Sequence, residues 1–144
     1  MKASTFTIAC IVVPLLAVSC SIPAVILDGR DPEGVQRGSP HRVDEARIED
    51  RTIFVDIICG DFDSKPRDFR LFMTPENFQG SKPRHASLLL TYDNGGGRLL
   101  DGCNRMTLRF DLSPVLDRYR KQYGGEDEII LKFSGSKTVV RYSP

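Results

Sequence analysis

The segment from Arg105 to Leu112 alternates between apolar and polar side chains, and this pattern constrains the fold more than any other feature of the chain. The apolar residues at every second position are Met106, Leu108, Phe110 and Leu112. A period of two is typical of a β-strand with one face buried and the other in solvent. The segment therefore predicts a strand that lies on the surface of a hydrophobic core.

Further segments rich in β-branched and aromatic residues predict further strands. They cover residues 52–59, 69–73, 85–92, 98–100, 128–133 and 137–142. Residues 93–97 tolerate positive φ and predict a tight reversal, after which 98–100 returns beside 85–92. One helix is expected over 114–123, with Ser113 as its N-cap and a Gly pair at its end. The sequence thus predicts an all-β fold, an antiparallel β-sandwich of about six or seven strands with one short helix.

The N-terminal residues have the layout of a secretory signal: Lys2, a charge-free run over 6–18, and small residues around position 20. The run is shorter than the roughly 20 apolar residues that a membrane-spanning helix needs. Residues 28–51 are dense in charges of both signs, and this composition predicts a flexible linker, which is placed over 21–50. The expected organisation is a signal peptide over 1–20, a linker over 21–50 and a sandwich domain over 51–144, in a secreted, extracellular protein.

Export would place the cysteines in an oxidising compartment, where disulfides persist. Cys59 and Cys103 are the expected disulfide pair, and their separation corresponds to about 4 kcal/mol of stabilisation in the chain-entropy model. Two fates remain open for Cys20. Cleavage after Cys20 removes it, or residues 16–20 form a bacterial lipobox and Cys20 carries a lipid that anchors the chain in a bacterial envelope.

The 20 Lys and Arg residues nearly balance the 19 Asp and Glu residues. Nucleic-acid and anionic-membrane binding both require a clear basic excess, so neither is expected. A membrane contact is expected only if Cys20 is lipidated.

Catalytic and metal-binding residues are expected to be absent, and no cofactor is predicted. His85 is the one histidine of the predicted domain, which is too few for a histidine metal site. Asp61 and Asp63 have the alternate spacing of calcium ligands, but two carboxylates are too few for a site of their own. Whether they bind calcium is left open, and a small secreted hydrolase that uses Asp61, Asp63 or His85 stays an alternative.

Basic residues gather in the middle of the predicted domain and on the predicted helix, where they can contact an acidic partner surface. The contact candidates are Lys65, Arg67, Lys82, Arg84 and Arg118. Loops and an exposed edge strand that accepts a strand of the partner are the expected means of binding.

The layout of signal, short polar spacer and β-rich body with two cysteines resembles small secreted effectors of plant-pathogenic fungi, in the one-disulfide β-sandwich class. Residues 69–142 also resemble the C-terminal β domain of tyrosinases and hemocyanins in the order of their elements. The first resemblance implies a protein that binds a host protein and does not catalyse a reaction. The second implies only a shared sandwich topology.

Overall fold

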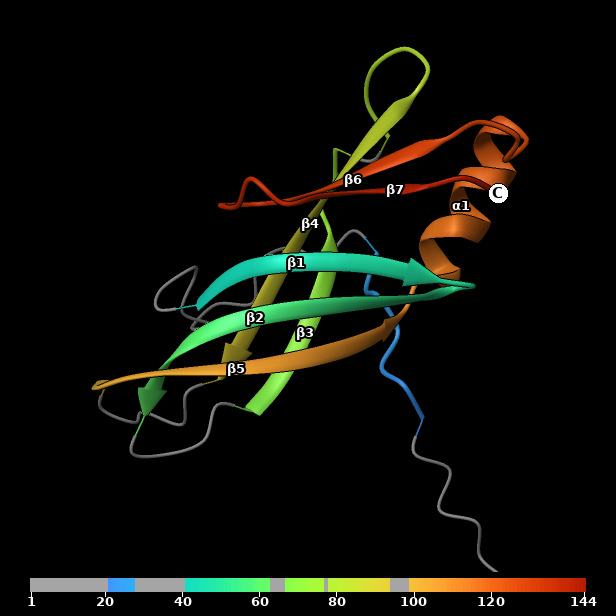
Figure 1. Ribbon diagram of the computed structural model, residues 1–144. Helices are drawn as coiled ribbons and strands as arrows, with labels where there is room; N and C mark the ends of the chain where they lie inside the picture. The colour runs from blue at the N-terminus through green and yellow to red at the C-terminus, as the bar shows by residue number, and fades with distance from the viewer. Residues whose placement is uncertain (1–20, 28–40, 63–66, 77, 94–98) are drawn as a thin grey trace, which may run out of the picture.

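A computed structural model describes residues 21–27, 41–62, 67–76, 78–93 and 99–144, and of 41, 59–62, 67, 93 and 99–104 the backbone alone. Two β-sheets face each other (Figure 1). The three-stranded sheet has the order β1-β2-β5 and contains β1 (His41–Glu49), β2 (Thr52–Phe62) and β5 (Leu99–Asp111). The four-stranded sheet has the order β3-β4-β6-β7 and contains β3 (Arg67–Met73), β4 (Arg84–Asp93), β6 (Ile129–Phe133) and β7 (Val139–Tyr142). The expected all-β sandwich with a single helix, α1 (Ser113–Tyr123), is confirmed.

The core lies between the two sheets, because each central strand buries every second side chain. In β2 these are Ile53, Val55 and Ile57, and in β4 they are Ala86, Leu88 and Leu90. β3 and β4 pass behind β1, β2 and β5 at a steep angle (Figure 1), as in sandwiches whose sheets cross. Helix α1 covers one end of the core with Val115, Leu116 and Tyr119.

Two strand pairings differ from the sequence prediction. β5 pairs with β2, in the opposite sheet from β4, so the predicted return of 98–100 beside 85–92 is wrong. The turn itself, at 94–98, lies outside the described residues. Since β5 and α1 together connect β4 to β6, these two strands lie side by side in parallel, and the sandwich is antiparallel everywhere else in its named strands.

β1 corrects the predicted boundary between linker and domain. It pairs antiparallel with β2 along its length, with a bulge between Val43 and Glu45, so the folded body begins before residue 51. Val43, Ala46 and Ile48 face the core, and charged residues occupy the solvent face between them. An edge strand of this kind resembles a linker in composition, because most of its residues are charged and only a few apolar residues mark the face that packs on the core. Residues 28–40 lie outside the described residues.

The start of the predicted linker is also part of the fold. Residues 23–26, the N-terminal strap, cross from β5 to β3 and bridge the two sheets. The Val25 N–H donates to the carbonyl of Asp111, and the Ile26 N–H donates to the carbonyl of Leu71, both at 2.9 Å. The Val25 side chain is only 2% exposed and belongs to the core. The strap therefore closes one side of the sandwich.

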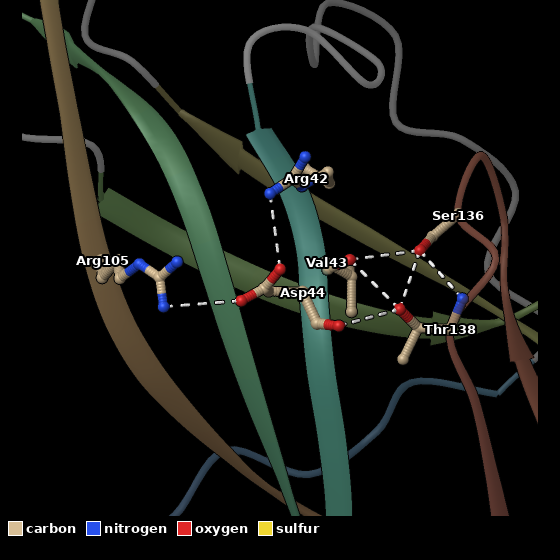
Figure 2. A network of polar contacts seen from close by, with 6 residues as sticks. All are labelled: Arg42, Val43, Asp44, Arg105, Ser136 and Thr138. Carbon is tan, nitrogen blue, oxygen red and sulfur yellow. Dashed lines mark hydrogen bonds and ion pairs between the residues drawn. The ribbon is translucent and has the colours of Figure 1, made fainter.

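The opposite side is closed by the turn between β6 and β7. The hydroxyls of Ser136 and Thr138 lie 3.2 and 3.1 Å from the carbonyl oxygen of Val43, at the bulge of β1 (Figure 2). Gly135, with φ 74°, provides the reversal that β6 and β7 need. With both sides closed, the sheets are held together by backbone-directed hydrogen bonds as well as by the core.

Helix α1 begins at Ser113, one residue before the prediction, and its cap differs from the prediction. The Ser113 side chain does not cap the helix; the Asp111 carboxylate accepts a hydrogen bond from the Ser113 backbone N–H at 2.9 Å. The predicted end is confirmed, because Gly124 adopts φ 81° and donates its N–H to the carbonyl of Arg120.

Candidate binding surfaces

The five predicted contact residues do not form one described surface. Lys65 lies outside the described residues, and Arg67 is described only as the first residue of β3, where it pairs with Asp93. Arg118 is half-buried on α1. Lys82 and Arg84 come together beside the C-terminal half of α1, at the loop that precedes β4.

Arg84 stacks on an aromatic cluster of Phe78, Tyr119 and Tyr123. Its guanidinium carbon lies 3.9 Å from the centre of the Tyr123 ring, and its Nη1 donates to the Gly80 carbonyl at 2.9 Å. The ring centres of Phe78 and Tyr119 are 4.9 Å apart, in an edge-to-face arrangement. Arg84 therefore joins the loop to the helix, so much of its binding capacity is already used within the chain.

Lys82 is engaged in the same way. Its ammonium lies 3.0 and 2.7 Å from the two carboxylate oxygens of Asp127, and this hydrogen bond raises the pKa of Lys82. Burial raises the pKa of the Tyr119 hydroxyl, which has no hydrogen-bond partner among the described residues. The contacts between this loop and α1 thus stabilise the fold. The Lys82 side chain, which is 70% exposed, is the more accessible of the two basic side chains to a partner.

Of the candidates for catalysis and metal binding, only His85 has a described side chain. His85 is half-buried in β4 and exchanges backbone hydrogen bonds with Gln79; its buried Nδ1 has no hydrogen-bond partner in the part of the chain that the structure describes. Asp61 is described by its backbone pairing with Leu100 alone, and Asp63 lies outside the described residues. Within the described part of the chain no group of three or more His, Cys, Asp and Glu side chains is placed to hold a metal ion.

The cysteines lie on neighbouring strands. Cys59 of β2 is paired with Asn104 of β5, and Gly60 is paired with Cys103. Their sulfur atoms lie outside what the structure describes, so the disulfide stays a prediction.

The solvent face of the β1-β2-β5 sheet carries ordered rows of charged residues. Arg47, Phe54 and Arg109 lie side by side across the three strands, and the Arg47 guanidinium stacks 4.7 Å from the centre of the Phe54 ring. Asp56 of the next row accepts hydrogen bonds from Arg47 and from the Thr107 hydroxyl. The Asp56 carboxylate, in the middle of the sheet, is therefore already engaged by neighbouring donors.

Asp44 lies in the same face, between Arg42 at 3.4 Å and Arg105 at 3.6 Å (Figure 2). A shallow depression of about 380 Å³ opens beside it, lined by Asp44, Asp56, Arg105 and Thr107 among others. Arg109 has no ion-pair or hydrogen-bond partner within the described part of the chain. Among the described arginines of this face, Arg109 on β5 is therefore the one whose charge is not paired.

The outer edge of β5 is the part of the sheet that is open to another strand. In a regular strand, the N–H and C=O of one residue point to the same side, and successive residues alternate. Both backbone groups of Asp111 point outward, since they bond to the strap. Register with β2 is uninterrupted from Asp111 back to Cys103, so the N–H and C=O groups of Arg105, Thr107 and Arg109 also point outward.

The strap satisfies only the last of these outward groups. A parallel ladder would next require the N–H of Pro23 to donate to the Arg109 carbonyl, and proline has no N–H. In the described residues no backbone group pairs with the outer edge of β5 at 105–109. Ile22 is 38% exposed, as expected for a chain that leaves the sheet at this point.

Each of the other three edges is paired, contacted by a turn, or short. β3 is paired with the strap at Leu71 and Met73, β1 meets the β6–β7 turn at Val43, and β7 has only four residues. Sequence reasoning placed Thr107 and Arg109 on the polar side of a strand, but it did not identify them as contact residues. The alternation of apolar and polar residues showed which side chains face solvent. It could not show the strand order, which places β5 at the edge of its sheet.

No helix in the described part of the chain is long and apolar enough to cross a membrane. The chain matches no protein-family model, and comparison with curated proteins and with solved structures finds no match either. The resemblances to fungal effectors and to tyrosinase and hemocyanin β domains therefore stay predictions.

Proposed function

We propose that the chain is a secreted, non-enzymatic protein-binding module of the pathogen-effector type, which acts by binding a host protein. The observation that carries the proposal is the outer edge of β5 from Arg105 to Arg109, whose outward backbone groups have no partner in the part of the chain that the structure describes. Protein partners are commonly recognised by adding an extended segment to such an edge, since main-chain hydrogen bonds supply affinity and alternate side chains supply specificity.

The rest of the fold supports this use of the edge. The β1-β2-β5 sheet is fixed to the second sheet by the strap on one side and by Ser136 and Thr138 on the other. A rigid sheet requires little ordering when a partner binds, so less of the interaction free energy is lost. Natural edge strands that have no partner are usually short or covered; β5 is long, and no described residue pairs with its outer edge along 105–109.

The experiment is affinity capture with the purified, immobilised protein from extracts of candidate hosts, followed by mass spectrometry. A captured protein is then purified and its affinity measured by calorimetry. We expect saturable binding with one partner per chain. The control is Ile57→Asp, which places a carboxylate at a core position that is 1% exposed and so unfolds the sandwich. Equal capture by the wild type and by this unfolded variant would overturn the proposed function.

A further inference from the structure

We propose that the outer edge of β5 at Arg105–Arg109 accepts an extended segment whose side chains alternate between acidic or polar and apolar. The inference rests on the proposed function and specifies the chemistry of the partner. It follows from three properties of the edge: its unpaired backbone groups, the charges on its solvent face and the apolar side chains on its inner face.

The backbone provides the ladder. The outward N–H and C=O groups of Arg105, Thr107 and Arg109 continue the line of Asp111, which already pairs with Ala24 of the strap in parallel orientation. Since Pro23 ends that ladder, the strap does not occupy the next positions. An added strand would begin where the strap stops and would run along the rest of the edge.

The solvent face selects acidic side chains. Arg105 has a side chain 75% exposed and one ion pair, with Asp44 at 3.6 Å, and Arg109 has no partner within the described residues. Asp56 is engaged by Arg47 and Thr107, and Asp44 lies 3.6 Å from Arg105. An acidic side chain of the partner therefore shares Arg105 with Asp44, and at Arg109 it meets no competing acid among the described residues. Directly opposed residues in neighbouring strands have Cβ atoms about 5 Å apart, close enough for an acidic side chain to pair with each arginine.

The inner face selects apolar side chains at the intervening positions. Met106 and Leu108 point toward the core but are only half-buried, since no described strand lies beyond them. A neighbouring strand would place every second side chain against these two residues and remove them from water. The pattern acidic–apolar–polar–apolar–acidic therefore matches the edge over five residues.

A second copy of the chain fits the same edge less well. Symmetric antiparallel pairing centred on Thr107 would place Arg105 of each copy opposite Arg109 of the other. Like charges directly opposite each other destabilise a strand pair. The charge pattern thus favours a partner of different sequence.

The test uses two labelled peptides, Gly-Glu-Val-Thr-Val-Glu-Gly and its counterpart with Lys at both Glu positions, in a fluorescence anisotropy titration. We expect the acidic peptide to bind at least about tenfold more tightly than the basic one. Hydrogen exchange should show new protection at the amides of Arg105, Thr107 and Arg109. Equal affinity for both peptides, or protection elsewhere alone, would overturn the inference.

Variants separate the backbone from the charge. Thr107→Pro removes one outward N–H, which an edge strand tolerates, and Thr107→Val is its control because it loses the hydroxyl but keeps the N–H. We expect binding to be lost in the first and kept in the second. Arg105→Glu with Arg109→Glu should reverse the preference between the two peptides, and Lys132→Glu, on the exposed face of β6, should leave it unchanged.

The variants also distinguish this inference from the proposed function. If a host partner is captured equally by the wild type, by Thr107→Pro and by the double charge reversal, the protein is a binding module but the edge of β5 is not its site. If analytical ultracentrifugation shows that the wild type dimerises and that Thr107→Pro does not, the edge pairs with a second copy, and the acidic-strand inference is wrong.

Discussion

The carbonyl oxygen of Pro23 accepts a hydrogen bond from the backbone N–H of Asp111 at 2.9 Å. This contact joins the start of the described chain to the end of β5, across a stretch of sequence that contains β1 to β5. Through this contact the strap pairs with the outer edge of β5 at Asp111. The pairing stops there, because Pro23 has no N–H with which to continue the ladder.

The strap should contribute measurably to stability. Val25→Ala removes apolar atoms from a side chain that is 2% exposed, and we expect a loss of about 1–3 kcal/mol in the free energy of unfolding. Ile22→Ala, at a residue 38% exposed beside the strap, should change it by less than about 0.5 kcal/mol. Urea denaturation measures both values, and equal effects would contradict the role of the strap in the core.

If residues 1–20 are removed on export, cleavage must leave the strap intact. We expect intact-mass analysis of the secreted protein to place its first residue at or before Pro23, because Pro23 and Val25 both bond to Asp111. A mature chain that begins after Val25 would contradict this expectation. A mass increase corresponding to lipid on Cys20, abolished by Cys20→Ala, would favour the envelope lipoprotein instead.

Asp111 should make stability depend on acid pH. Hydrogen bonds from Ser113, followed by the charge of Arg51, lower the pKa of the Asp111 carboxyl in the folded chain. A carboxyl whose pKa is lower in the folded chain stabilises the fold at pH values above its pKa in the unfolded chain. This stabilisation is lost as the pH falls through the pKa of the folded chain. Asp111→Asn should therefore cost about 0.5–1 kcal/mol at neutral pH, and the difference from wild type should shrink below about pH 3.9.

Thermal unfolding at a series of pH values measures this effect. Asp50→Asn is the matched control, since Asp50 is exposed and Asn tolerates its φ of 53°. A stability difference for Asp111→Asn that stays constant down to pH 2 would argue against the carboxylate as the cap of α1.

The β6–β7 turn should stabilise the other side of the sandwich. Replacing both hydroxyls, in Ser136→Ala with Thr138→Val, leaves the carbonyl of Val43 without these donors. We expect a loss of about 1–2 kcal/mol and faster hydrogen exchange in β1. Lys137→Ala, between the two and exposed, should change stability by less than about 0.5 kcal/mol. A similar loss in both proteins would contradict the argument.

The predicted disulfide between Cys59 and Cys103 can be tested by mass. The non-reduced protein should be two hydrogen atoms lighter than the reduced protein. A peptide map should contain one cross-linked pair that joins β2 to β5. Free thiols at both positions in the exported protein would show that the prediction is wrong.

The central strands, which contain many apolar residues, could be predicted from the sequence. β2 and β4 are rich in β-branched residues and leucine, and α1 has Pro114 at its start and Gly124 after its end. β1 and the strap were interpreted as a linker, because an edge strand buries few side chains and carries charges on its open face. Their stability comes from pairing with β2, β3 and β5, which are distant in sequence.

The candidate site was less predictable than the fold. Lys82 and Arg84 were identified from charge alone, yet Asp127 and Tyr123 engage them in ways that local composition does not reveal. The open edge of β5 depends on strand order, and the local turn signal at 93–97 favoured the wrong neighbour. Non-local pairing is decided by the packing of whole sheets, so the sequence predicts the strands better than their neighbours.

The clustered rings of Phe78, Tyr119 and Tyr123 give the protein an optical reporter. The chain has no tryptophan and four tyrosines, so its near-ultraviolet emission comes from tyrosine alone. Tyr119 and Tyr123 lie with ring centres 5.4 Å apart beneath Arg84, where contact with the loop before β4 determines their surroundings. Separation of that loop from α1 can therefore be followed spectroscopically in the unlabelled, unmodified protein.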